Sequence, residues 1–190
     1  MRHEAGIFLL ALSITVSGCA TGPMPELQPT MANLQVLKAA NLPALAVGQF
    51  ALADGLPPSM DRSIAIRAVT MKAPGTGSFA GYLKKALETE LWGAGKLNPA
   101  AASIIEGELT ESRITTGLPE GRAVLGARFR VRRAGQTVYD RELTVQTSWA
   151  SNFIGAIAIP EAMDRYTSLY PTLVGALLED ATFRAAVRMP

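Results

Sequence analysis

The sequence is poor in the two side chains that most often carry chemistry, histidine and cysteine. Its 190 residues include one of each, His3 and Cys19, and both lie near the N-terminus. Histidine supplies the acid–base step of Ser-His-Asp and Cys-His sites and is a frequent zinc ligand, so residues 20–190 lack these means of catalysis. A lone cysteine also excludes a disulfide within the chain. We therefore expect no cofactor, no metal site and no catalytic residue.

An excess of charge of one sign is lacking as well. The chain has 18 lysine and arginine residues against 16 aspartate and glutamate residues. Proteins that bind nucleic acid through general electrostatic attraction concentrate positive charge on one surface. The balance predicts that nucleic acid is not a partner, and that any role of charge in this protein is local.

What the N-terminus does contain is an export pattern. An apolar run at residues 7–16 follows Arg2 and is too short to cross a bilayer as a permanent helix, which is typical of the core of a signal peptide. It ends at Val16-Ser17-Gly18-Cys19, which resembles the lipobox of bacterial lipoproteins. The resemblance implies that residues 1–18 are removed and that Cys19 carries diacylglyceryl and palmitoyl chains, which attach the protein to the membrane. The alternative is an ordinary secretory signal in which a cysteine occurs by chance.

The same resemblance bears on location. Lipoproteins of this kind that stay in the inner membrane often carry aspartate directly after the lipidated cysteine, and this chain has Ala20. The resemblance therefore places the protein on the periplasmic face of the outer membrane. Residues 19–43 are rich in proline and predict a tether, within which residues 31–40 could form a short helix.

Residues 44–190 predict a single α+β domain. Two early strands at 44–51 and 63–71 precede a helix that begins after Ser78 and ends near Gly93. Alternating apolar residues then predict a three-stranded antiparallel meander and, from Pro160, a C-terminal helix packed on the apolar face of the sheet. The three strands of the meander are expected at 103–114, 124–132 and 137–147.

This order of elements resembles small envelope lipoproteins, namely the YajG-like lipoproteins and the ABC-type transport auxiliary lipoproteins. In these families a helix is followed by a strand of the Ile105-Glu106-Gly107-Glu108-Leu109 kind, then by hairpins and a terminal helix. The resemblance implies a non-catalytic binding, assembly or transport-accessory role in the cell envelope, with an envelope protein or transport complex as partner. It transfers no site residue.

The meander offers two candidate sites on its charged face. Three arginines, Arg128, Arg130 and Arg132, alternate along the central strand and could bind an anionic ligand such as a lipid phosphate, or form a solvated ladder of salt bridges. Glu106 and Glu108 lie roughly 7 Å apart on the neighbouring strand, a separation that glycosidases use. A carboxylate-dependent envelope hydrolase is therefore the alternative function.

The segment from Trp149 to Ile159 is the candidate contact surface. It is apolar without a clear period, so we expect a loop that must be covered. Either it is buried under the C-terminal helix, or it touches a partner or the bilayer interface. In the second case the contact residues would be Trp149, Phe153, Ile154 and Ile157.

Overall fold

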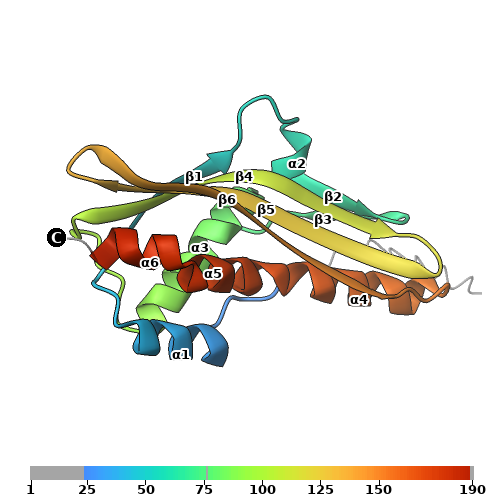
Figure 1. Cartoon of the computed structure of the whole chain (residues 1–190). Helices are drawn as coiled ribbons and strands as arrows, with labels where there is room; N and C mark the ends of the chain where they lie inside the picture. The colour runs from blue at the N-terminus through green and yellow to red at the C-terminus, as the bar shows by residue number, and fades with distance from the viewer. Residues whose placement is uncertain (1–23, 76, 189–190) are drawn as a thin grey trace, which may run out of the picture.

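The computed structural model describes residues 24–75 and 77–188. Along the chain the elements are α1 (Met31–Ala40), β1 (Ala46–Leu52), α2 (Ser59–Arg62), β2 (Ser63–Ile66), β3 (Val69–Lys72), α3 (Phe79–Gly93), β4 (Ser103–Thr116), β5 (Glu120–Arg133), β6 (Gln136–Ala150), α4 (Gly155–Thr167), α5 (Leu169–Glu179) and α6 (Ala181–Arg188). Figure 1 shows the sheet as one layer with the larger helices beneath it, which confirms the α+β class.

Four strands form the main sheet in the order β1-β4-β5-β6. Strands β4, β5 and β6 are antiparallel neighbours, which confirms the meander, and β1 lies parallel to β4. Each strand of the meander is longer than predicted because pairing continues through polar residues, where apolar alternation gives no signal. Arg122, for example, is paired with Thr115 on one side and Ser148 on the other.

The helices cover one face of the sheet. Helix α3 packs on β1 and β4, α4 on β4 and β5, α5 on β5 and β6, and α6 on β6. The apolar strand residues point toward these helices, and Ile105, Leu109, Phe129 and Val131 are fully buried there. The opposite face is open and carries the charged residues of the meander. The C-terminal helical region thus packs on the apolar face, as predicted.

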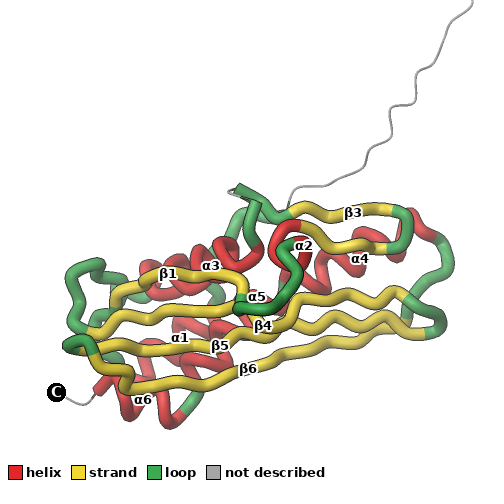
Figure 2. Tube along the Cα trace, turned by 90° about the horizontal axis from the view of Figure 1, so that it is seen from above, coloured by secondary structure: helices red, strands yellow, loops and turns green. Residues whose placement is uncertain are grey.

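The strand predicted at 63–71 is instead a hairpin of two short strands. Ile66 of β2 is paired with Val69 of β3, and Arg67 turns the chain with a φ of 54°, in the left-handed region. The prediction was wrong because the apolar alternation runs through the turn without a glycine or proline to mark it. The hairpin lies beside β4 (Figure 2).

Part of the predicted tether, residues 19–43, belongs to the folded domain. Helix α1 packs on α3 and α5, and its Leu37 is fully buried. The buried carboxylate of Glu90 accepts hydrogen bonds from Thr30 N at 3.0 and 3.1 Å and from Asn33 Nδ2 at 2.9 Å. Because these bonds satisfy both the buried carboxylate and the backbone amide of Thr30, which caps α1, the helix is fixed to the core.

The C-terminal helical region begins at Gly155 rather than at Pro160, which lies inside α4. Proline has no amide hydrogen to donate to the carbonyl of Ala156, and that residue is exposed, so water can replace the missing bond. Ser168 separates α4 from α5. Pro171 then lies in the first turn of α5, where proline is tolerated.

A bulge in β4 after Leu109 changes which face its later residues occupy. Ser112 turns inward, and its hydroxyl oxygen lies 2.7 Å from Tyr166 Oη, which in turn lies 2.7 Å from Tyr170 Oη. Burial raises the pKa of both tyrosines. The chain of hydroxyl groups is therefore a neutral, internally satisfied part of the core.

Candidate functional site

The charged face of the sheet is built from ion pairs between neighbouring strands. Arg130 Nη1 and Nη2 lie 2.7 and 3.0 Å from the two carboxylate oxygens of Glu108. On the other side, Arg128 Nε and Nη2 lie 2.5 and 2.8 Å from the carboxylate of Asp140, and Arg130 Nε lies 3.3 Å from it. Both arginines thus have carboxylate partners on the strands that flank β5.

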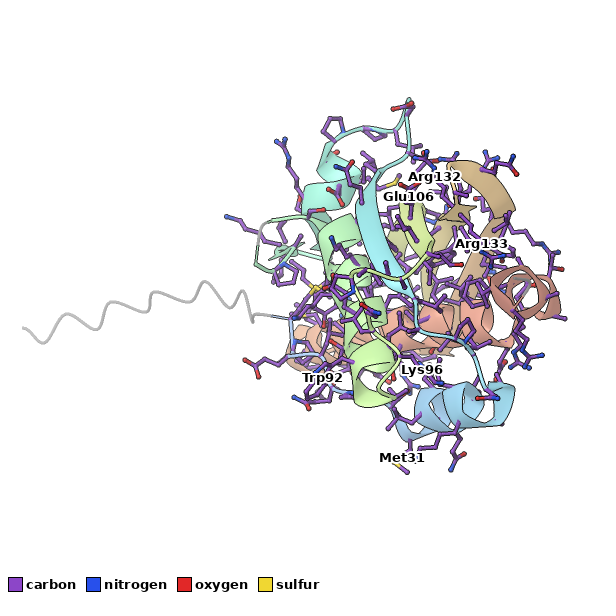
Figure 3. The ribbon with its side chains drawn as sticks, turned by 90° about the vertical axis from the view of Figure 1, so that its left-hand side faces the viewer. Met31, Trp92, Lys96, Glu106, Arg132 and Arg133 are labelled. Carbon is purple, nitrogen blue, oxygen red and sulfur yellow. The ribbon has the colours of Figure 1, made fainter. Side chains whose placement is uncertain are left out.

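Arg132, the third arginine of the predicted face, is paired more loosely. Its Nη1 lies 3.7 Å from Glu106 Oε1, and Figure 3 shows the two side chains close together on the open side of the sheet. The register places Glu106 opposite Arg130 and Glu108 opposite Arg128, yet each glutamate pairs with the next arginine along β5. Strand twist brings such diagonal neighbours within reach of long side chains.

The electrostatics of this face agree with its geometry. Hydrogen bonds from Arg128 lower the pKa of Asp140, and the bond to Asp140 raises the pKa of Arg128. The hydrogen bond to Glu108 likewise raises the pKa of Arg130. Each cation therefore has a partner within the protein, as the salt-ladder interpretation expects. Binding of an anionic ligand by these arginines stays a prediction.

The two glutamates of the hydrolase alternative belong to the same ladder. A hollow of about 180 Å³ lies between them and Gln49 of β1. Glu108 is engaged by both terminal nitrogens of Arg130, and Glu106 faces Arg132. In such a network the carboxylate oxygens meet guanidinium groups rather than a substrate.

Trp149 belongs to the core and not to an exposed surface. It is the last inward-facing residue of β6 and is 6% exposed. Its ring lies against Gly121 on the adjacent strand, where an added Cβ would come within 2.4 Å of the indole. The segment from Trp149 to Ile159 is also not one loop, because it comprises the end of β6, a connection at 151–154 and the start of α4.

The other three predicted contact residues are exposed together at one end of the molecule. Phe153 is 76% exposed, Ile157 51% and Ile154 45%. The turn between β4 and β5 adds Leu118, which is 64% exposed and which the sequence did not single out. The two segments touch, because Ser151 N donates to Pro119 O at 2.8 Å. We refer to the four exposed residues as the apolar tip: Leu118, Phe153, Ile154 and Ile157.

Arg67 holds the tip to the hairpin of β2 and β3. Its Nη1 donates to Phe153 O at 3.0 Å, and its Nη2 donates to Ser151 Oγ at 3.2 Å and to Asn152 O. The three acceptors are consecutive, so one guanidinium fixes the whole connection between β6 and α4. Sequence patterns missed this residue because its partners lie 84 to 86 positions away.

The predicted lipidation site, Cys19, lies outside the described residues. The description begins at Met24, which is 6% exposed and lines a cleft of about 660 Å³ together with Pro74, Tyr82 and Lys85. The Tyr82 hydroxyl donates to Pro25 O at 2.8 Å, which fixes the chain at this point. The predicted attachment point is therefore five residues from a fixed position on the domain.

Over residues 24–75 and 77–188, no three acidic, cysteine or histidine side chains are grouped as a metal site would require. None of the helices in this part of the chain has the length and apolar character needed to cross a bilayer.

Comparison with known proteins yields a fold but no family. No family model and no curated protein matches the sequence. A solved structure from Xanthomonas campestris, assigned to the family DUF330, matches with a TM-score of 0.50 at 16% identity, over 82% of this chain and 92% of that chain. At this identity the likeness concerns the fold alone.

Two other solved structures are similar at lower TM-scores. The minor lipoprotein from Acinetobacter baumannii matches with a TM-score of 0.40 at 15% identity, over 77% of this chain and 94% of that chain. The PelC dodecamer from Paraburkholderia phytofirmans matches with a TM-score of 0.41 at 15% identity, over 77% of this chain and 89% of that chain.

Proposed function

We propose that the protein is a lipid-anchored accessory of the bacterial cell envelope that works by binding rather than by catalysis. The observation that supports this proposal is the apolar tip, where four large apolar side chains are exposed at one end of the domain. The arginines of the charged face, in contrast, form ion pairs within the domain. Exposed apolar residues gathered in one place are typical of a contact surface. The tip would be held against another component of the envelope by a chain anchored at Cys19.

The hydrolase alternative has weaker support. Its two carboxylates, Glu106 and Glu108, face arginines at 3.7 and 2.7 Å. A retaining or inverting hydrolase needs one protonated and one ionised carboxyl group around a substrate cleft. The hollow between these residues is about 180 Å³, smaller than the clefts that usually bind small molecules. The geometry therefore favours binding.

The anchor is tested by metabolic labelling. The protein should incorporate labelled palmitate, and Cys19→Ala should abolish the label and yield an unprocessed form, because the lipid is attached through the sulfur. Fractionation should place the lipidated protein in the outer membrane. An unlabelled protein would contradict the lipoprotein assignment, and recovery with the inner membrane would contradict the location only.

The contact surface is tested separately, by replacing single residues with a photocrosslinking amino acid in intact cells. A crosslinker at Phe153 should be shielded and should capture protein or lipid. The matched control is Trp92, which is also a large apolar residue, 71% exposed, but lies at the far end of α3 (Figure 3). Equal capture from both positions would show that the tip is not a specific contact.

A further inference from the structure

The apolar tip belongs to a long stretch without charge. Residues 143–160 contain no aspartate, glutamate, lysine, arginine or histidine. The stretch covers the second half of β6, the connection at 151–154 and the first half of α4. Leu118 of the adjacent turn adds a second apolar projection beside Phe153. A projecting tip of this kind is suited to enter an apolar medium rather than to receive a ligand.

The apolar tip and Met24, which follows the predicted lipid attachment point by five residues, lie near opposite ends of one short strand. Val69, the first residue of β3, borders a hollow of about 400 Å³ with Gly155 and Ile159 of α4. Pro74, just beyond the other end of β3, borders the cleft that contains Met24. Val69 and Pro74 are five residues apart, so at most about 17 Å of chain separates the hollow beside α4 from the cleft beside Met24.

The same length limits how far the domain can lie from the membrane. Cys19 precedes Met24 by five residues, so the lipidated cysteine can be no more than about 17 Å from the fixed part of the domain. The bilayer surface must therefore lie close to this side of the domain. Figure 2 shows β2, β3 and α4 together on this side, beyond β4.

The segment that includes β2, β3 and the first half of α3 carries charge of one sign. Residues 62–87 contain five lysines and arginines and no acidic residue. Lys84 faces Glu88 at 3.9 Å and Arg67 is bound to the tip, which leaves three exposed cations. Within the described part of the chain, no ion pair involves these three, which we call the basic strip: Arg62, Lys72 and Lys85.

Carboxylates also lie near the strip, and Asp164 borders the hollow beside Val69. Asp61 accepts a hydrogen bond from Ala80 N at 2.7 Å, and Glu26 and Glu88 border the cleft beside Met24. The strip would attract an anionic surface, and a cation near such a membrane contributes about fivefold to binding.

We propose that the apolar tip inserts into the interfacial region of an anionic phospholipid bilayer while the basic strip faces the headgroups. The proposal rests on the lipid anchor of the proposed function and adds the orientation of the domain, with β3 and α4 toward the membrane. A lipid chain alone attaches a protein without orienting it, whereas a second contact fixes one face. A protein partner at the tip would need no cations on the side of the domain that carries the anchor.

The test uses the full chain, lipidated, in phosphatidylcholine vesicles with or without phosphatidylglycerol. An environment-sensitive fluorophore is attached at Phe153→Cys and, as the matched control, at Trp92→Cys. Because the sulfur of Cys19 is bound to lipid, the introduced thiol is the one that reacts. In vesicles with phosphatidylglycerol the label at 153 should shift to shorter wavelength and be quenched by brominated lipid, and the label at 92 should do neither.

The electrostatic part is tested with two triple variants that remove the same charge. Changing Arg62, Lys72 and Lys85 to glutamine should lower the ratio of inserted to free tips by about fivefold per cation. The matched control changes the sheet arginines Arg128, Arg130 and Arg132 to glutamine and should leave the ratio unchanged. Equal loss in both variants would show that net charge, and not the strip, is responsible.

The remaining outcomes separate the two proposals. If the protein stays on the vesicles but the label at 153 remains in water, the anchor holds and the orientation is overturned. If the label is shielded only when an envelope protein is added, the tip binds protein and the proposal is again overturned. If a second fluorophore reacts at Cys19, the lipid is absent, and both the proposed function and the orientation are overturned.

Discussion

The open face of the sheet and the apolar tip are both exposed, but they differ in how their groups are satisfied. On the sheet face, Arg130 and Arg128 have carboxylate partners at 2.7 and 2.5 Å. At the tip, Phe153 is 76% exposed and Leu118 is 64% exposed. The charged face is thus complete in the isolated domain, whereas the tip becomes covered only through something outside it.

This difference in how the two surfaces are satisfied indicates that the tip is the functional surface. A row of cross-strand ion pairs contributes little to stability and offers little net charge to a ligand. Removing an exposed apolar group from water lowers the free energy of the system. A tip that Arg67 fixes in place therefore favours association with a partner that covers it. The predictions below test this distinction, beginning with the largest expected effect.

The first prediction divides the apolar segment into its buried and exposed parts. Trp149→Ala should lower the free energy of unfolding by about 3–5 kcal/mol, because it removes a core indole and leaves a cavity. Phe153→Ala should change it by less than about 0.5 kcal/mol, because the ring is already in water. Urea unfolding of both variants measures the contrast, and similar losses would contradict the assignment of Trp149 to the core.

The second prediction concerns a carboxylate that is buried rather than exposed. Glu90→Ala should lower the free energy of unfolding by about 1–3 kcal/mol, because Thr30 N loses its acceptor and Asn33 Nδ2 keeps only the carbonyl of Pro171. Hydrogen exchange should then accelerate in α1. The control is Glu88→Ala, which lies on α3 like Glu90. Its partner Lys84 lies 3.9 Å away near the surface, so the substitution should hardly change the free energy of unfolding.

The charged face was largely predictable from the sequence, whereas the tip was predictable only in part. Phe153, Ile154 and Ile157 were expected at a contact surface, but Leu118 and the role of Arg67 were not. Alternation along β4 and β5 is a local signal, and once the meander is assumed it places Glu108 and Arg130 on one face. The bulge after Leu109 escaped prediction because one extra residue leaves no local mark. The diagonal choice of ion-pair partners follows from strand twist, which the sequence does not display.

The tip depends on contacts between distant segments, and these have no sequence signature. Arg67 reaches the connection after β6 from a turn that the alternating pattern hides. Leu118 joins Phe153 only because the turn after β4 lies beside the end of β6. The sequence places α1 in a tether because the contact that fixes it is not local. Glu90, which accepts from Thr30, lies 60 positions further along the chain.

The third prediction loosens the tip without changing its apolar residues. Arg67→Ala removes the donor to three consecutive acceptors, which water can reach, so the free energy of unfolding should fall by only about 1 kcal/mol. The amides of residues 151–154 should nevertheless exchange faster. The control is Arg67→Lys, which keeps the charge but cannot bind the acceptors as a fork, and which should give an intermediate rate. An unchanged rate in both variants would show that Arg67 does not hold the tip.

The last prediction has the smallest effect and concerns pH. Hydrogen bonds from Arg128 lower the pKa of Asp140 in the folded protein, so folding favours its ionised form. Its contribution is therefore present above the unfolded pKa of about 4 and is lost as the pH falls through the lower folded pKa. Asp140→Asn should cost less than about 1 kcal/mol at pH 7, because the pair is largely exposed, and the difference from wild type should shrink toward pH 2.5. Phe153→Ala should show no such pH dependence relative to wild type, because the tip carries no titrating group. Unfolding by urea across this pH range measures both, and a difference for Asp140→Asn that grew on acidification would contradict the assignment of the ladder.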